Sequence, residues 1–91
     1  MKNTHKVNLK IPNHLRSFVL ESMNPHRFIR EMVNTDFKKP AQLTLLEKDK
    51  SAKLKLSVYF SDKEFAHINQ HGKPAAFVIA LIDFNFKQLE K

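Results

Sequence analysis

The chain has 91 residues, and its 16 Lys and Arg against 9 Asp and Glu give a net charge of +7, which favours a polyanionic partner. That length fits one small domain, or two fused subunits that share one core. The chain contains no Cys, which excludes disulfides and cysteine-based metal sites or nucleophiles, and no apolar run of transmembrane length.

Residues 6–12 alternate strictly between polar and apolar side chains, which is the period of a strand with one buried face. The side chains predicted to face the core are Val7, Leu9 and Ile11. The side chains predicted to face solvent are Lys6, Asn8 and Lys10. Pro12 closes the pattern at a position where its missing N–H costs little.

Apolar residues at spacings of three and four then predict two helices. The inner face of the first is expected to contain Leu15, Phe18, Val19 and Met23. Asn24 and Pro25 predict the boundary, because Asn is a preferred N-cap and Pro is a preferred first helical residue. The inner face of the second helix is expected to contain Phe28, Ile29, Met32, Val33 and Phe37.

A linker is predicted over residues 40–52, between a first unit, residues 1–39, and a second unit, residues 53–91. The linker begins at Pro40 and contains a charged, solvated stretch. Its leucines are apolar enough to lie against the core: Leu43, Leu45 and Leu46. We therefore expect the two units to pack as one domain.

The pattern restarts with a second alternating strand, whose outer face is predicted to contain Lys53, Lys55, Ser57 and Tyr59. Ser61 is a helix cap, and Phe65 and Ile68 are expected to face inward from the helix that follows. Gly72 ends that helix and suits a left-handed terminus, and Pro74 begins the last helix. The inner residues expected in the last helix are Phe77, Val78, Leu81 and Ile82, with Phe86 near its end.

The two units superpose at an offset of 49 residues, which indicates an internal duplication of strand, helix and helix. One such unit buries too little surface to be stable alone, so we expect the two to pair around one core. The predicted fold is α+β and mostly helical, with one two-stranded antiparallel ribbon in an intramolecular pseudo-dimer. In the expected register, the pairs across the ribbon are Asn8 with Ser57, Lys10 with Lys55 and Lys6 with Tyr59.

Six polar side chains form the outer face of this ribbon: Lys6, Asn8, Lys10, Lys55, Ser57 and Tyr59. They are candidates for base contacts in a DNA major groove, because Lys suits O6 and N7 of guanine and Asn suits N6 and N7 of adenine. Tyr59 is expected to contact a phosphate or a thymine methyl group. The alternative interpretation is the solvated face of an ordinary sheet.

The second helix of each unit begins with residues that can bind an anion, because a helix N-terminus combines free N–H groups with the positive end of the helix dipole. The candidates for phosphate contacts are Asn24, His26, Arg27, Lys73 and Ala75. Plain helix capping is the alternative interpretation of these positions.

Residues 7–12 resemble the strand and turn of the ribbon-helix-helix family, the MetJ/Arc type of bacterial and phage DNA-binding protein, and residues 28–33 resemble its second helix. Residues 56–62 and 72–74 match more loosely. Two tandem copies imply a covalent pseudo-dimer whose ribbon enters the major groove. The resemblance also implies that the helix starts clamp the DNA backbone.

The expected function is sequence-specific binding of double-stranded DNA, as a transcriptional repressor in the cytoplasm or nucleoid of a bacterial, phage or plasmid system. A relaxosome accessory protein and an antitoxin with a protein partner remain alternatives, and self-association of pseudo-dimers stays open. No catalytic triad, phosphate-binding loop or carboxylate pair stands out, so neither an enzyme nor a cofactor is expected, and no signal peptide or membrane contact is expected either. His67 and His71 have metal-binding spacing, but no Cys or nearby carboxylate completes a site.

Overall fold

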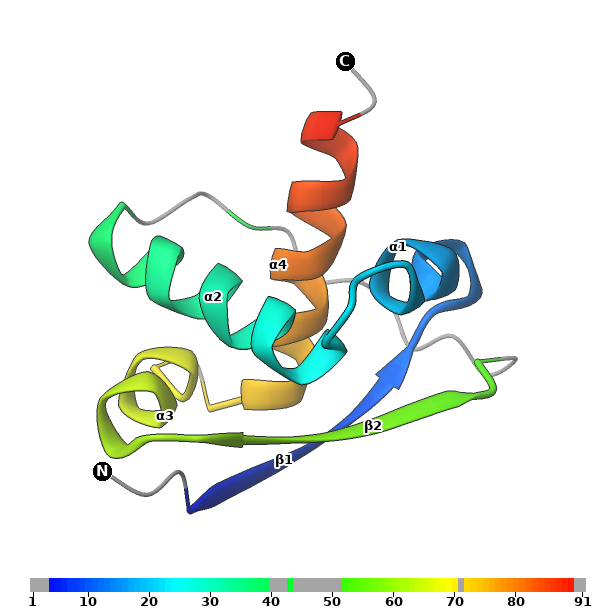
Figure 1. Ribbon diagram of the computed structural model, residues 1–91. Helices are drawn as coiled ribbons and strands as arrows, with labels where there is room; N and C mark the ends of the chain where they lie inside the picture. Colours follow the sequence, from blue (N-terminus) through cyan, green and yellow to red (C-terminus); the bar gives the residue numbers. More distant parts are fainter. Residues whose placement is uncertain (1–3, 40–42, 44–51, 71, 90–91) are drawn as a thin grey trace.

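The computed structural model describes residues 4–39, 43, 52–70 and 72–89, and their fold is α+β and mostly helical. Within these residues the elements are β1 (His5–Ile11), a short 3-10 helix η1 (Asn13–Leu15), α1 (Arg16–Leu20), α2 (Pro25–Lys38), β2 (Leu54–Phe60), α3 (Asp62–Ile68) and α4 (Pro74–Leu89). Figure 1 shows β1 and β2 as a ribbon along the bottom, with the helices stacked above one of its faces. The other face of the ribbon is therefore open.

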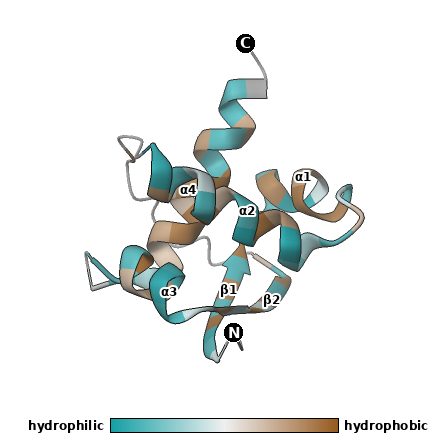
Figure 2. Ribbon diagram, turned by 60° about the vertical axis from the view of Figure 1, so that its left-hand side comes forward, coloured by the Kyte–Doolittle hydropathy of each residue, from teal (hydrophilic) through white to brown (hydrophobic). Residues whose placement is uncertain are grey.

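The ribbon is antiparallel and has the predicted register. Lys6 lies opposite Tyr59, Asn8 opposite Ser57 and Lys10 opposite Lys55. Val7, Leu9 and Ile11 are buried, while the polar residues between them are exposed. The β1 strand in Figure 2 accordingly carries alternating teal and brown bands. This alternation follows from the pleat, which directs successive side chains to opposite faces.

Local backbone chemistry explains where three of the helices begin. Asn24 caps α2, since its Oδ1 accepts a hydrogen bond from the Arg27 amide over 3.1 Å. Ser61 caps α3 in a capping box, in which the Ser61 and Glu64 side chains each accept from the other residue's amide. Pro74 begins α4, as predicted.

The chain between α3 and α4 contains the predicted left-handed glycine, although α3 ends earlier than expected. Gly72 has a φ of +74°, which strains any residue with a Cβ. The last residue of α3 is Ile68, and the Gly72 amide donates to the Asn69 carbonyl over 3.0 Å. The glycine therefore belongs to the turn that follows the helix rather than to its final turn.

The first predicted helix is shorter than expected, and Met23 does not face the core. The segment divides into η1 and α1, and α1 ends at Leu20. Ser22 Oγ donates to the Val19 carbonyl over 2.7 Å, which takes up an acceptor that a continuing helix would use. The residue before a proline also avoids helical angles, and Asn24 is extended. Met23 consequently lies on the exposed connection.

At the end of α2 the residue that faces the core is Asp36 and not the predicted Phe37. Phe37 is 57% exposed, whereas Asp36 is 4% exposed. The inward stripe of α2 continues from Ile29 through Val33 to position 36, and position 37 lies about 100° further round the helix. The spacing of the apolar residues thus predicted the inner face of α2 correctly from Phe28 to Val33, less than two turns, and failed at Phe37.

The core combines side chains from both sides of the linker. Helix α4 packs on β1, and α2 packs on β2, so each strand supports a helix from the other part of the chain. Leu43 packs against this core as predicted, whereas Leu45 and Leu46 lie outside the described residues. The most deeply buried side chains are Leu9, Ile11, Leu15, Val19, Ile29, Val33, Val58, Phe60, Ile68, Val78 and Ile82.

The predicted inward residues of the last helix, Phe77, Val78, Leu81 and Ile82, are buried, and Phe86 is half-buried against the core. Leu54, Leu56 and Phe65 are also half-buried against it. None of the described helices is both long enough and apolar enough to cross a membrane.

Candidate nucleic-acid interface

The outer face of the ribbon brings together all six side chains predicted to contact bases. Lys6, Asn8, Lys10, Lys55 and Tyr59 are exposed, and Ser57 is half-buried. They occupy three successive cross-strand pairs on one face, because alternate residues of paired strands point the same way. The result is a compact polar surface that carries three Lys side chains and no carboxylate among its paired residues.

The middle pair is held by a side-chain hydrogen bond. Ser57 Oγ donates to Asn8 Oδ1 over 2.8 Å. The two residues are direct partners in the ladder, so the bond links the strands at the centre of the outer face.

The two ends of this face differ in charge. At one end Lys10 lies directly opposite Lys55, and exposed Lys53 precedes β2. Like charges directly opposite each other repel, and these lysines make this end of the face electropositive. At the other end Lys6 pairs with Tyr59, a residue that is 48% exposed. The ribbon therefore presents two cations at one end and one cation beside an aromatic ring at the other.

The start of α2 contains three of the predicted phosphate-contacting residues, but two of them are already engaged. The Asn24 side chain accepts from the Arg27 amide, and Arg27 Nε donates to Glu31 Oε1 over 3.1 Å. The Arg27 and Glu31 side chains are both largely exposed, so an incoming anion can compete for the guanidinium. His26 is also exposed at this helix start.

The start of α4 contains the other two predicted phosphate-contacting residues. Lys73 is exposed, and its ammonium cannot accept a hydrogen bond, so it cannot cap the helix. The Phe77 amide donates to the Lys73 carbonyl over 3.0 Å. In the described part of the chain, the Ala75 and Ala76 amides have no hydrogen-bond partner, and both residues are half-buried. Unlike the Asn24 side chain at α2, the Lys73 side chain therefore accepts no hydrogen bond from the first turn of its helix.

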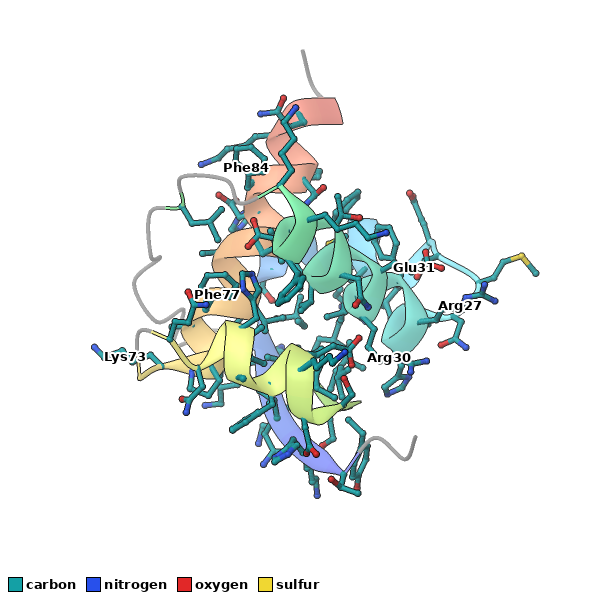
Figure 3. All side chains as sticks on the ribbon, turned by 90° about the vertical axis from the view of Figure 1, so that its left-hand side faces the viewer. Arg27, Arg30, Glu31, Lys73, Phe77 and Phe84 are labelled. Carbon is teal, nitrogen blue, oxygen red and sulfur yellow. The ribbon has the colours of Figure 1, made fainter. Side chains whose placement is uncertain are left out.

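The two helix starts lie far apart. Figure 3 shows Arg27 and Arg30 at the start of α2 on one side of the molecule and Lys73 on the other. Each helix packs on one strand of the ribbon, α2 on β2 and α4 on β1. The helix starts are therefore positioned by the same core that positions the strands.

Three His–Asp contacts, which the sequence patterns did not predict, join the chain before the linker to the chain after it. His5 Nε2 lies 2.6 Å from Asp62 Oδ1, His14 Nε2 lies 2.8 Å from Asp83 Oδ1, and His67 Nε2 lies 2.7 Å from Asp36 Oδ2. Only the helical spacing of Asp36 with Ile29 and Val33 pointed to a buried acid. These contacts tie the two parts of the chain together rather than face the ribbon's outer surface.

Asp83 is a buried carboxyl group with a perturbed pKa. Burial of the side chain by itself raises its pKa, but hydrogen bonds and charge from His14 and Lys87 outweigh that effect. The pKa of Asp83 consequently lies below the usual value for an aspartate. The carboxylate is thus ionised at neutral pH although it is buried.

Of the two histidines with metal-binding spacing, His67 is described and His71 lies outside the described residues. His67 is occupied by Asp36 and by edge-on contacts with the rings of Phe37 and Phe77. Within the described residues, no group of three or more His, Asp or Glu side chains could hold a metal ion.

Among the described residues, the open face of the ribbon is the best candidate site, because it gathers hydrogen-bond donors and positive charge on two strands that pack on the core. Comparison of the chain with protein-family models, with curated proteins and with solved structures found no match in any of the three.

Proposed function

We propose that this protein binds double-stranded DNA sequence-specifically, as a ribbon-helix-helix transcriptional repressor that inserts β1 and β2 into the major groove. The observation that carries the proposal is the in-register ribbon, which presents its three outward pairs on a face that the helices leave open. The major groove is wide enough for a two-stranded ribbon and exposes donors and acceptors that distinguish all base pairs. Lys, Asn and Ser are side chains that pair with these groups.

Several contacts support a pseudo-dimer of residues 1–39 and 53–91. Asn8 and Ser57 are 49 residues apart and are partners at the ribbon's centre, where a two-fold axis would relate them. Asn34 Nδ2 donates to Glu64 Oε2 over 2.6 Å, and the related contact joins Asp83 to His14. Asn34 and Asp83 differ by the same 49 residues, whereas His14 and Glu64 differ by 50, because the first helices of the two units are shifted by one residue. The exchange of α2 and α4 between the strands fits this symmetry.

The helix starts supply the backbone contacts in this proposal. Arg27, His26 and Lys73 are exposed, and Ala75 lies in the first turn of α4, where backbone amides point out of the helix end. Such groups bind phosphate oxygens without regard to sequence, so they would fix the register of the ribbon on the duplex. The base-contacting face would then supply the sequence preference.

The test is selection from a random pool of duplex DNA, followed by affinity measurements at low and moderate salt. We expect an enriched sequence and an affinity that falls steeply with salt, because Lys and Arg release counterions from phosphates. Lys10→Ala should weaken binding, whereas Lys38→Ala removes the same charge at the far end of α2 and should change affinity little. An affinity that is flat with salt and an unenriched pool would overturn the proposal.

A relaxosome accessory protein would need the same ribbon and would differ only in where its site lies. The position of the enriched sequence, beside a promoter or within a transfer origin, separates this role from repression. Co-purification of a small partner protein would instead favour the antitoxin role.

A further inference from the structure

We infer that Ser57 is a positioning residue for base reading, whose hydroxyl holds the Asn8 carboxamide ready to pair with adenine. This inference rests on the proposed function of the ribbon and assigns one specificity element within it. It concerns the hydrogen bond at the ribbon's centre, which neither the residue types nor the strand pattern predicts.

The geometry places the two side chains directly against each other. Asn8 and Ser57 are partners in the ladder, and Ser57 Oγ donates to Asn8 Oδ1 over 2.8 Å. Asn8 is exposed and Ser57 is half-buried. The short Ser57 side chain therefore holds the longer and more exposed Asn8 side chain. The bond draws the carboxamide oxygen toward β2 and leaves the nitrogen on the opposite side of the carboxamide.

The remaining hydrogen-bonding capacity of Asn8 matches the edge of adenine. A carboxamide oxygen has two acceptor sites, and its nitrogen carries two hydrogens. Ser57 uses one acceptor site, and no described residue accepts from the Asn8 nitrogen. One acceptor site and both hydrogens are therefore left, and adenine offers an N6 donor and an N7 acceptor in the major groove.

Fixing the Asn8 carboxamide in the free protein also lowers the conformational entropy lost on DNA binding. An exposed Asn samples several rotamers, and a contact with a base must select one of them. With Ser57 in place, much of this ordering occurs on folding rather than on association. The other outward pairs, Lys10 with Lys55 and Lys6 with Tyr59, lie two residues away from this pair, one on each side of it. Ser57 is thus the side chain directly opposite Asn8.

The first experiment is a double-mutant cycle on DNA. Wild type, Ser57→Ala, Asn8→Ala and the double variant are bound to the selected duplex and to duplexes with each base pair changed. Asn8→Ala should lower discrimination at one base pair roughly 5- to 150-fold. Ser57→Ala should lower discrimination at that same base pair about 2- to 10-fold and should have no further effect in the Asn8→Ala background.

A conservative variant and a measurement on the free protein complete the test. Ser57→Thr keeps the hydroxyl and should retain wild-type discrimination. NMR relaxation of the Asn8 side-chain amide should show greater mobility in Ser57→Ala than in Ser57→Thr or wild type. Salt slopes should be the same for all variants, because no phosphate contact is removed.

The outcomes separate this inference from the proposed function. Wild-type discrimination in Ser57→Ala, alongside a loss in Asn8→Ala, would overturn the inference and leave DNA binding intact. A further loss from Ser57→Ala in the Asn8→Ala background would mean that Ser57 reads a base itself, and unchanged Asn8 mobility would also overturn the positioning role. Salt-independent binding without any enriched sequence would overturn the inference and the proposed function together.

Discussion

Asp36 and His67 form a buried pair between α2 and α3. Asp36 Oδ2 and His67 Nε2 are 2.7 Å apart, and their side chains are 3% and 7% exposed. The ring of His67 also meets Phe37 and Phe77 edge-on. Each of the two buried side chains thus has a hydrogen-bond partner, at a place where α2, α3 and α4 pack together.

Asp36→Ala should lower the free energy of unfolding by about 3 kcal/mol, because it leaves the buried imidazole without its partner. Urea unfolding at neutral pH measures the loss. Asp62→Ala is the matched control, since it breaks a His–Asp contact whose carboxylate is 85% exposed, and it should cost less than about 1 kcal/mol. Equal losses in the two variants would contradict the structural role of the buried pair.

Asp83 should make stability depend on pH in the acid range. Its folded-state pKa is lowered, so it binds a proton less readily folded than unfolded. Its contribution is therefore fully present above the unfolded pKa of about 3.9 and is lost as pH falls through the lower folded pKa. Asp83→Asn should be less stable than wild type at neutral pH, and the difference should shrink below about pH 4. Urea unfolding at pH 7, 5 and 3 tests this, and a difference that grew on acidification would contradict it.

The linker should make folding independent of protein concentration. Each strand supports a helix from the other part of the chain, so neither part keeps its core alone. Intact protein should melt at the same temperature over a wide range of concentration. Cleavage at a protease site inserted between residues 40 and 52 should make the melting temperature rise with concentration. A cleaved protein without that dependence would show that one half is stable by itself.

Arg27 and Glu31 should act in opposite directions on DNA binding. If the chain binds DNA as proposed, Arg27→Ala should weaken binding to selected and scrambled duplexes alike and should reduce the salt slope by about one, because the proposed phosphate contact is lost. Glu31→Gln should strengthen binding to both duplexes, because Glu31 Oε1 no longer holds the guanidinium at 3.1 Å. In the Arg27→Ala background the gain from Glu31→Gln should be smaller. A loss of preference for the selected duplex in Arg27→Ala would contradict a backbone role.

The ribbon and the ends of several elements were determined by the sequence itself. The alternation of Lys6, Val7, Asn8 and Leu9 predicts the buried face, since a one-residue shift would place lysines inside. The 49-residue offset places Asn8 opposite Ser57, as the structure has it. Asn24, Ser61, Gly72 and Pro74 act on their own backbone or on residues within one helical turn. Signals of this range can be read without knowing how the elements pack.

Tertiary structure alone decided the contacts between residues far apart in the chain. The His67–Asp36 contact spans 31 residues and the His14–Asp83 contact spans 69, and both depend on how helices from different parts of the chain meet. The exposure of Phe37 also depends on packing, because position 37 lies about 100° round the helix from Asp36 and it is Asp36 that α3 contacts, through His67. The orientation of Asn8 also depends on a partner 49 residues away, since a hydroxyl can direct a carboxamide only after the two strands have paired.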